Sequence, residues 1–160
     1  MMQLNFRTAT SDDIPLLTKL SSEWEEENSC HGYQRNQAEH FAKYRVFIVE
    51  FEGEVIGYLF GTVEHSKNMT AMMPAGSTYF EVEELYIDSR FRSQGIGRAF
   101  MQYLETILLS EGIDKMVLST ATKDYRRILH FYIDEMGMSF WHAKLFKELQ
   151  RTDILHEENP

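Results

Sequence analysis

The stretch EELYIDSRFRSQGIGRAF, residues 83–100, combines three local signals in eighteen consecutive residues. It begins with an apolar run typical of a strand, continues through a loop rich in arginine, and ends where two glycines open a helical pattern. The first N–H groups of a helix have no intrahelical acceptor and carry partial positive charge, so an anion binds well there. The stretch therefore predicts a strand, an anion-binding loop and a helix, in that order.

The strand that leads into this loop contains a break in its alternation. Phe80 and Val82 are apolar at even positions, whereas Leu85 and Ile87 are apolar at odd positions. One extra residue between the two pairs, a β-bulge, would keep both pairs on one face of the sheet. The alternative is an unbroken strand in which Tyr86 simply continues the even face.

The loop itself has the composition of a phosphate site. Arg92 and Arg98 can add charge-assisted contacts, and Gly95 and Gly97 allow the backbone to approach a ligand closely. A Walker loop, which needs Gly-Lys followed by Ser or Thr, is excluded because the chain has Gly97-Arg98-Ala99 there. A dinucleotide fingerprint is excluded because Phe100 replaces its third glycine. The loop suits a phosphate or pyrophosphate, and the alternative is a plain glycine turn with solvated arginines.

Bulk composition places the chain among small globular proteins. Its 160 residues suffice for one domain, with 43% hydrophobic and 26% charged residues, and a single cysteine, Cys30, cannot form an internal disulfide. The net charge of −9 argues against nucleic acid and favours a cationic partner. We expect a cytoplasmic protein with no metal and no membrane partner, made of one domain over residues 1–149 and a C-terminal tail over 150–160.

Periodicity along the chain predicts an α/β fold (α+β mixed sheet). Glu52-Gly53 between two β-rich runs indicates a hairpin, and the strand–helix–strand unit after it should form a parallel pair. A mixed sheet covered by helices follows. The expected strands span 3–9, 46–51, 55–63, 79–87, 115–120 and 139–149, and the expected helices span about 12–27, 36–44, 96–111 and 124–136.

Two motifs in this order resemble the GNAT superfamily of N-acetyltransferases. The run from Arg92 to Gly97, RSQGIG, is similar to the family's [RQ]-x-x-G-x-[GA] motif, after a bulged strand VEELYI and before an amphipathic helix. A later strand and helix bear Phe131-Tyr132 and then Gly137-Met138, as in the family. The resemblance spans about residues 3–149, and it implies a central mixed sheet with a bulged, splayed strand pair flanked by about four helices.

The resemblance also implies acetyl-coenzyme A as the donor substrate. Backbone N–H groups over the loop would hold the pyrophosphate, the strand before it would pair with the pantetheine, and the same strand edge would polarise the thioester oxygen. Tyr125 stands where relatives often carry Asn. The implied cofactor-binding residues are Leu85, Tyr86, Ile87, Arg92, Ser93, Gln94, Gly95, Ile96, Gly97, Arg98, Ala99 and Tyr125.

The acceptor implied by the resemblance is an amine, whose ammonium form must lose a proton before it attacks. With a pKa of about 10.4, that deprotonation costs roughly 4–5 kcal/mol at pH 7. Glu83 is the first choice for the base because relatives acting on polyamines carry Glu there, and Glu84 is the second. Either carboxylate can instead be an edge residue facing solvent. Tyr132 would hydrogen-bond the departing thiolate, although its helical spacing also suits simple packing.

The sequence thus predicts an enzyme that transfers acetyl from acetyl-CoA to a primary amine, cationic in character, of a small-molecule or peptide/protein acceptor. The amine would attack directly in a ternary complex. One rival is an acyl-CoA-binding sensor or scaffold without turnover, and another is a different phosphate-binding enzyme. Little room is left after Gly137 for the family's last hairpin. A single long strand there, or one that pairs across a homodimer, is the expectation.

Overall fold

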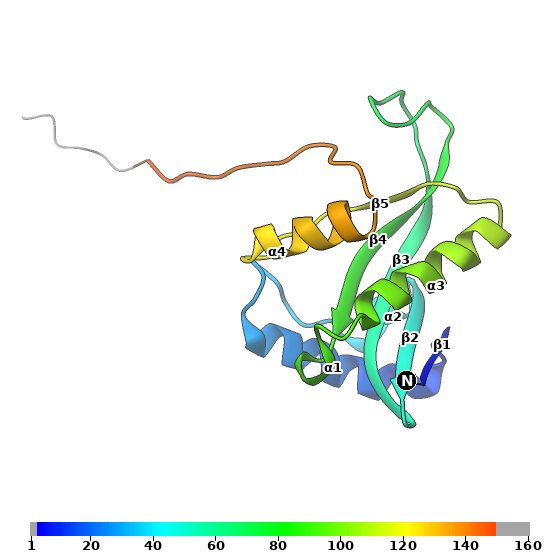
Figure 1. Ribbon diagram of the computed structural model, residues 1–160, viewed down its shortest axis with the longest axis vertical. Helices are drawn as coiled ribbons and strands as arrows, with labels where there is room; N and C mark the ends of the chain where they lie inside the picture. Colours follow the sequence, from blue (N-terminus) through cyan, green and yellow to red (C-terminus); the bar gives the residue numbers. More distant parts are fainter. Residues whose placement is uncertain (1–2, 150–160) are drawn as a thin grey trace, which may run out of the picture.

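The computed structural model describes residues 3–149, and its centre is one five-stranded sheet (Figure 1). The strand order is β1-β2-β3-β4-β5; the first three junctions are antiparallel and the last is parallel. Within these residues, no helix has the length and apolarity needed to cross a membrane. The strands are β1 Leu4–Thr8, β2 Arg45–Phe51, β3 Glu54–His65, β4 Thr78–Ile87 and β5 Met116–Leu118.

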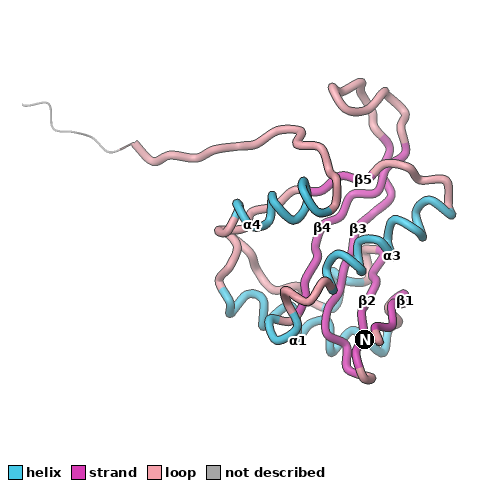
Figure 2. The backbone as a smooth tube through the Cα atoms, viewed as in Figure 1, coloured by secondary structure: helices cyan, strands magenta, loops and turns pink. Residues whose placement is uncertain are grey.

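Helices cover both faces of the sheet, as the trace in Figure 2 shows. The first two pack with one apolar cluster around Leu17, Phe41 and Tyr58, and α3 packs with a second around Phe80 and Phe100. The mixed sheet and its helical layers confirm the predicted fold class. The helical elements are η1 Ser11–Asp13, α1 Ile14–Glu27, α2 Ala38–Phe41, η2 Ser89–Phe91, α3 Ile96–Ser110, α4 Tyr125–Leu129 and the π-helical η3 His130–Glu135.

The predicted hairpin is present between β2 and β3. Glu52 and Gly53 both have positive φ, at 50° and 82°, which matches the turn that a two-residue hairpin of right-handed twist requires. Because the hairpin places β3 in the middle of the sheet, β3 can pair with β4 along most of its length.

The bulge in β4 is confirmed. Phe60 pairs with Glu84 and the next residue, Gly61, pairs with Val82, so Glu83 is the extra residue. The bulge keeps the apolar residues on both sides of it on the α3 face, while the side chain of Tyr86 is buried on the opposite, α1 face. Gly61 is required opposite the bulge, since a Cβ there would overlap the backbone oxygen of Glu81.

The parallel pair separates after three residues. β5 pairs with β4 only from Phe80–Met116 to Val82–Leu118, and β4 continues to Ile87 without a partner on that side among the described residues. The two strands therefore splay apart immediately beyond the bulge. This divergence positions the cleft described below.

Three expected elements differ in length, and one is absent. The helix expected over 36–44 is a single turn, the strand over 115–120 is three residues long, and the helix over 124–136 changes to π geometry at His130. The strand predicted over 139–149 was wrong for this chain alone: those residues lie outside any strand and extend away from the domain (Figure 1). A strand needs a backbone partner, and this segment makes no backbone hydrogen bond to the rest of the described residues. The predicted tail, 150–160, lies outside the described residues.

Candidate active site

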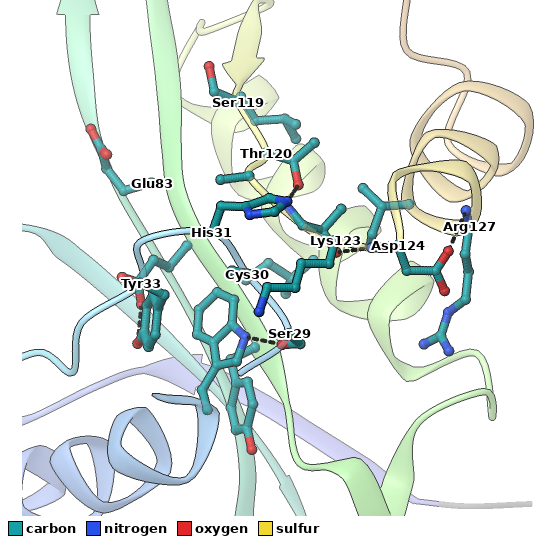
Figure 3. A pocket seen from close by; sticks show the side chains of 18 of the residues that line it. Ser29, Cys30, His31, Tyr33, Glu83, Ser119, Thr120, Lys123, Asp124 and Arg127 are labelled. Carbon is teal, nitrogen blue, oxygen red and sulfur yellow. Dashed lines mark hydrogen bonds between the residues drawn. The ribbon is translucent and has the colours of Figure 1, made fainter. Parts of the chain in front are cut away.

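A cleft of about 650 Å³ opens where β4 and β5 diverge. One wall is the end of β4, and the facing wall is the loop after β5 together with α4 and η3. Figure 3 shows Glu83 on one side of this cleft and Lys123, Asp124 and Arg127 on the other. The splay therefore brings residues from the two family-like motifs into one cavity.

The loop before α3 presents free donors. Ser93 and Gly95 both adopt left-handed backbone conformations, with φ of 60° and 79°, and a Cβ added at Gly95 would meet nothing within 4 Å. Among the described residues, no backbone N–H from Ser93 to Arg98 has an acceptor, whereas the N–H of Ala99 already donates to the Gly95 oxygen at 3.0 Å. Six of the seven predicted N–H groups are thus available to an anion, and that of Ala99 is not.

The two arginines of the loop are already paired with carboxylates. Arg92 donates to the Ile87 backbone oxygen at 2.7 Å and to Glu27 at 2.8 Å, and its guanidinium lies 5.2 Å from the centre of the Tyr86 ring. Arg98 pairs with Glu135 at 3.0 Å. Arg92 lines the cleft, but it also ties α1 to the end of β4. No sequence pattern pointed to Glu27 as its partner.

Glu83 and Glu84 occupy different environments although they are adjacent. Glu83, the bulged residue, lines the cleft with an exposed side chain that has no hydrogen bond among the described residues. Its pKa is raised, first by partial burial and then by the negative charges of Glu81 and Glu64. Glu83 is therefore a carboxylate that is open to a ligand in the cleft.

The Glu84 carboxylate is held by three neutral donors. It accepts from the Asn36 amide at 2.9 and 3.0 Å, from the Tyr58 hydroxyl at 2.9 Å and from the Tyr33 hydroxyl at 3.3 Å. Burial raises its pKa although these hydrogen bonds favour the charged form. Ser21 extends the network, since its hydroxyl lies 2.6 Å from that of Tyr33. Glu84 is thus an anchor that fixes the loop before α2 against the sheet.

The two tyrosines predicted on the last helix are placed differently. Tyr132 lines the cleft from η3; among the described residues its hydroxyl has no hydrogen bond, and burial raises its pKa to about 12. Tyr125 does not line the cleft, is 51% exposed and lies beneath the Arg126 guanidinium. Asp124, Arg127 and Ile128 line the cleft instead. Their spacing, one helical turn on a shared face, was the signal that sequence reasoning missed.

A strap that the sequence did not reveal closes one side of the cleft. The loop after α1 and the loop after β5 pair through two backbone hydrogen bonds, from His31 to Ala121 at 2.8 Å and from Lys123 to Ser29 at 2.9 Å. Trp24 supports this strap, because its indole donates to Ser29 at 3.2 Å and its ring packs against that of Tyr33 with centroids 4.3 Å apart. The strap gives the cleft a wall opposite β4 that is independent of the sheet.

Residues 3–149 contain no group of three or more His, Cys, Asp or Glu side chains arranged to hold a metal ion. The cleft instead combines a carboxylate, a tyrosine hydroxyl, an unpaired strand edge and a nearby set of free N–H donors. These groups can bind an anion at one end and accept a proton at the other.

The chain belongs to the Acetyltransferase (GNAT) family, whose model matches residues 14–138. No curated protein sequence matches the chain. This assignment confirms the resemblance drawn from the two motifs.

Solved structures with the same fold are distant in sequence. An aminoglycoside N-acetyltransferase, AAC(6')-Iy in complex with CoA, aligns with a TM-score of 0.69 at 13% identity over 94% of this chain and 97% of that one. A ribosomal-protein-alanine N-acetyltransferase from Brucella melitensis biovar Abortus 2308 gives 0.67 at 14% identity over 91% and 99%. An aminoglycoside acetyltransferase from an uncultured soil metagenomic sample gives 0.65 at 15% identity over 92% and 97%. These similarities establish the fold.

Proposed function

We propose that the protein is an N-acetyltransferase that moves the acetyl group of acetyl-CoA to a primary amine by direct attack in a ternary complex. One observation carries the proposal: Glu83, Tyr132 and the unpaired edge of β4 share a single cleft. Family membership supports acetyl transfer, and the CoA bound to AAC(6')-Iy supports the choice of donor. The acceptor is a small molecule or a peptide or protein amine.

The residues present fit an acyl-CoA. The six free N–H groups from Ser93 to Arg98 would hold the pyrophosphate, since they converge at a helix start and Gly95 leaves the approach open. The β4 backbone from Leu85 to Ile87, which faces the cleft without a β5 partner, would hydrogen-bond the pantetheine as an added strand does. Acetyl-CoA supplies the activated acetyl thioester.

Glu83 takes the proton that the acceptor ammonium must lose, directly or through one water molecule. Its carboxylate is exposed to the cleft and has no competing hydrogen bond among the described residues. Its raised pKa makes it a better proton acceptor than an ordinary glutamate. Glu84 keeps a supporting role, since Asn36 and the two tyrosines already occupy its oxygens.

Tyr132 donates a hydrogen bond from its hydroxyl group to the departing sulfur. With a pKa of about 12 the phenol is neutral at pH 7, and its hydroxyl has no other partner among the described residues. The amine nitrogen forms its bond to the acetyl carbon as the carbon–sulfur bond breaks, and the tyrosine hydrogen bond stabilises the thiolate. The second N–H proton of the former amine passes to the thiolate, which leaves a neutral amide and the free thiol of CoA.

A cationic acceptor fits the charge around Glu83. Glu81 and Glu64 contribute negative charge beside it, and the chain as a whole has a net charge of −9. The aminoglycoside and ribosomal-protein acceptors belong to the neighbouring proteins, and they guide only the choice of amines to test. A cytoplasmic location stays a prediction.

The proposal is tested by thiol release from acetyl-CoA across a panel of polyamines, aminoglycosides, amino acids and peptides. We expect thiol release that depends on at least one amine. Binding of acetyl-CoA without amine-dependent release would instead identify a non-catalytic acyl-CoA sensor. Thermal stabilisation by ATP or NAD, with none by acetyl-CoA, would identify a different phosphate-binding enzyme.

A further inference from the structure

One lysine of the described chain, Lys123, lines the cleft. It lies in the loop between β5 and α4, so its side chain enters the cleft from the wall that faces β4. In Figure 3 its amino group points away from Arg127 and toward the part of the cleft that holds Ser29 and Cys30. A primary amine of the chain itself therefore lies in the same cavity as the proposed base, Glu83.

The amino group of Lys123 is held by a neutral oxygen. Its Nζ donates to Asn28 Oδ1 at 2.7 Å, and within residues 3–149 it forms no ion pair. By contrast, the Lys115 Nζ lies 2.7 Å from the carboxylate of Asp114, outside the cleft. A carboxylate partner holds a lysine in its ammonium form, which cannot attack a carbonyl carbon. Among the described residues, Lys123 has no such restraint.

The strap fixes the backbone of Lys123 but leaves its side chain free to move. The Lys123 N–H donates to the Ser29 oxygen at 2.9 Å, beside the hydrogen bond from His31 to Ala121. The side chain is exposed, and its four-carbon stem is flexible. The amino group can therefore leave Asn28 and reach other positions in the cleft while the main chain stays in place.

We propose that Lys123 is an acetyl acceptor of the protein itself, modified by acetyl-CoA bound in the cleft of the same molecule. This inference rests on the proposed function, because it uses the same donor and the same base. The Lys123 ammonium passes one proton to Glu83, and its nitrogen then bonds to the acetyl carbon as the carbon–sulfur bond breaks. The second N–H proton passes to the thiolate, and Glu83 returns its proton to water. The products are a neutral amide on Lys123 and the free thiol of CoA.

Acetylation changes the charge on this wall of the cleft. Lys123 and Arg127 are the basic residues that the chain after β5 contributes to the lining, and the modification removes the charge of the first. A cationic acceptor is then repelled less, so the modified protein should bind cationic amines more tightly. The lost charge also lowers the isoelectric point, which gives a readout that does not depend on turnover.

Incubation of the full chain with acetyl-CoA, without any added amine, tests the proposal. Intact-protein mass spectrometry counts the acetyl groups, isoelectric focusing detects the lost charge, and peptide mapping locates the modified residue. We expect one acetyl group per chain, at Lys123, and no acetyl group at that position in Lys123→Arg. Lys115→Arg is the matched control, because its side chain lies outside the cleft. This control should be acetylated at Lys123 as fast as the unchanged protein.

Two further measurements separate catalysed transfer within one molecule from other routes. Glu83→Gln should slow the modification of Lys123 by about 10²-fold or more, because spontaneous reaction with a thioester would not need the base. The first-order rate constant should be independent of protein concentration. A rate constant that rises with protein concentration, or one that Glu83→Gln leaves unchanged, would overturn the proposal.

The site of modification decides the remaining outcomes. Acetylation spread evenly over the exposed lysines, or found instead on Cys30 as a thioester that hydroxylamine releases, would overturn the assignment of Lys123. Amine-dependent thiol release by a protein whose Lys123 stays unmodified would overturn this inference and leave the proposed function intact. Absence of both thiol release and acetylation would count against the proposed function as well.

Discussion

At the scale of single residues, two adjacent glutamates have opposite environments. The bulge gives Glu83 an exposed place in the cleft, while Glu84 turns into a network of neutral donors from Asn36, Tyr58 and Tyr33. The chemistry assigned to each follows from this difference: the free carboxylate can receive a proton, and the saturated one fixes the surrounding structure.

Glu83→Gln should lower kcat by about 10²-fold or more, since general-base catalysis contributes about 10²–10⁴-fold. The Glu83 carboxyl must be ionised to act, and its pKa is raised above 4.5. The wild-type rate should therefore fall as the pH drops through that raised value, and the variant should lose this acidic limb of its pH–rate profile. Glu39→Gln on α2, outside the cleft, serves as the control. An unchanged rate and pH profile in Glu83→Gln would exclude Glu83 as the base.

Tyr132→Phe should lower kcat by about 10–100-fold and leave acetyl-CoA affinity nearly unchanged. A hydrogen bond to a charged group is worth about 1.5–3 kcal/mol, and this one would form only as the sulfur departs. Tyr125→Phe is the matched control, because that ring is exposed and outside the cleft. Equal kcat values for the two variants would show that the Tyr132 hydroxyl takes no part in catalysis and that the ring only packs against its neighbours.

At the scale of elements, the start of α1 and the bulge of β4 depend on specific polar and steric contacts. Asp13 accepts two hydrogen bonds from Arg7, at 2.7 and 2.8 Å, and one from the Thr10 backbone at 2.7 Å. These contacts tie β1 to the first turn before α1, and α1 carries Trp24 to the cleft.

Asp13→Asn should reduce the free energy of unfolding by about 1–2 kcal/mol at pH 7. The Arg7 side chain, more than any other group, lowers the pKa of Asp13 to about 2, below its ordinary value of 3.8. The stabilisation is therefore complete above pH 3.8 and is lost as the pH falls toward 2. Urea unfolding at several pH values should show that the difference in the free energy of unfolding between wild type and variant becomes smaller as the pH falls through that range. Asp12→Asn, at an exposed neighbour, should show no such gap.

Gly61→Ala should destabilise the protein by about 1–3 kcal/mol, as overpacked sites do. The added Cβ would overlap the backbone oxygen of Glu81, which cannot move away by rotating a side chain. Gly97→Ala is the comparison, since its Cβ would lie 3.5 Å from Phe131, an ordinary contact. Urea unfolding measures both, and equal stability of the two variants would contradict the close approach of the strands at the bulge.

At the scale of the whole molecule, donor binding should stabilise the fold, because the proposed contacts come from β4, the loop before α3 and η3 together. A ligand at 100 times its Kd adds about 2.7 kcal/mol, which corresponds to roughly 5–10 °C in Tm for a domain of this size. Acetyl-CoA should produce this shift in a thermal-unfolding experiment.

Gly95→Asp should abolish the increase in Tm that acetyl-CoA produces. The residue has φ of 79°, which disfavours a side chain, and a carboxylate there would repel the phosphates. Unchanged stabilisation of this variant by acetyl-CoA would contradict the role of the loop.

Much of the fold and part of the site were predictable because they rest on local patterns. The phase change between Val82 and Leu85 predicted the bulge, and the glycines at 95 and 97 marked the start of α3. Both are consequences of short-range sterics that a few residues determine. The sequence-based prediction missed part of the cleft wall near α4. It named Tyr125 by analogy with relatives, whereas the residues that line the cleft there are Asp124, Arg127 and Ile128.

The amino-acid sequence by itself determined the order of the elements, the bulge in β4 and the glycine-containing loop before α3, because each depends on neighbouring residues in the chain. Only the tertiary structure decided the difference between Glu83 and Glu84, the pairing of Arg92 with Glu27, and the strap from His31 to Ala121. It also decided that Ser139–Leu149 finds no partner among the described residues of its own chain. These features join residues far apart in sequence, and their energies depend on burial and distance, which no local pattern encodes.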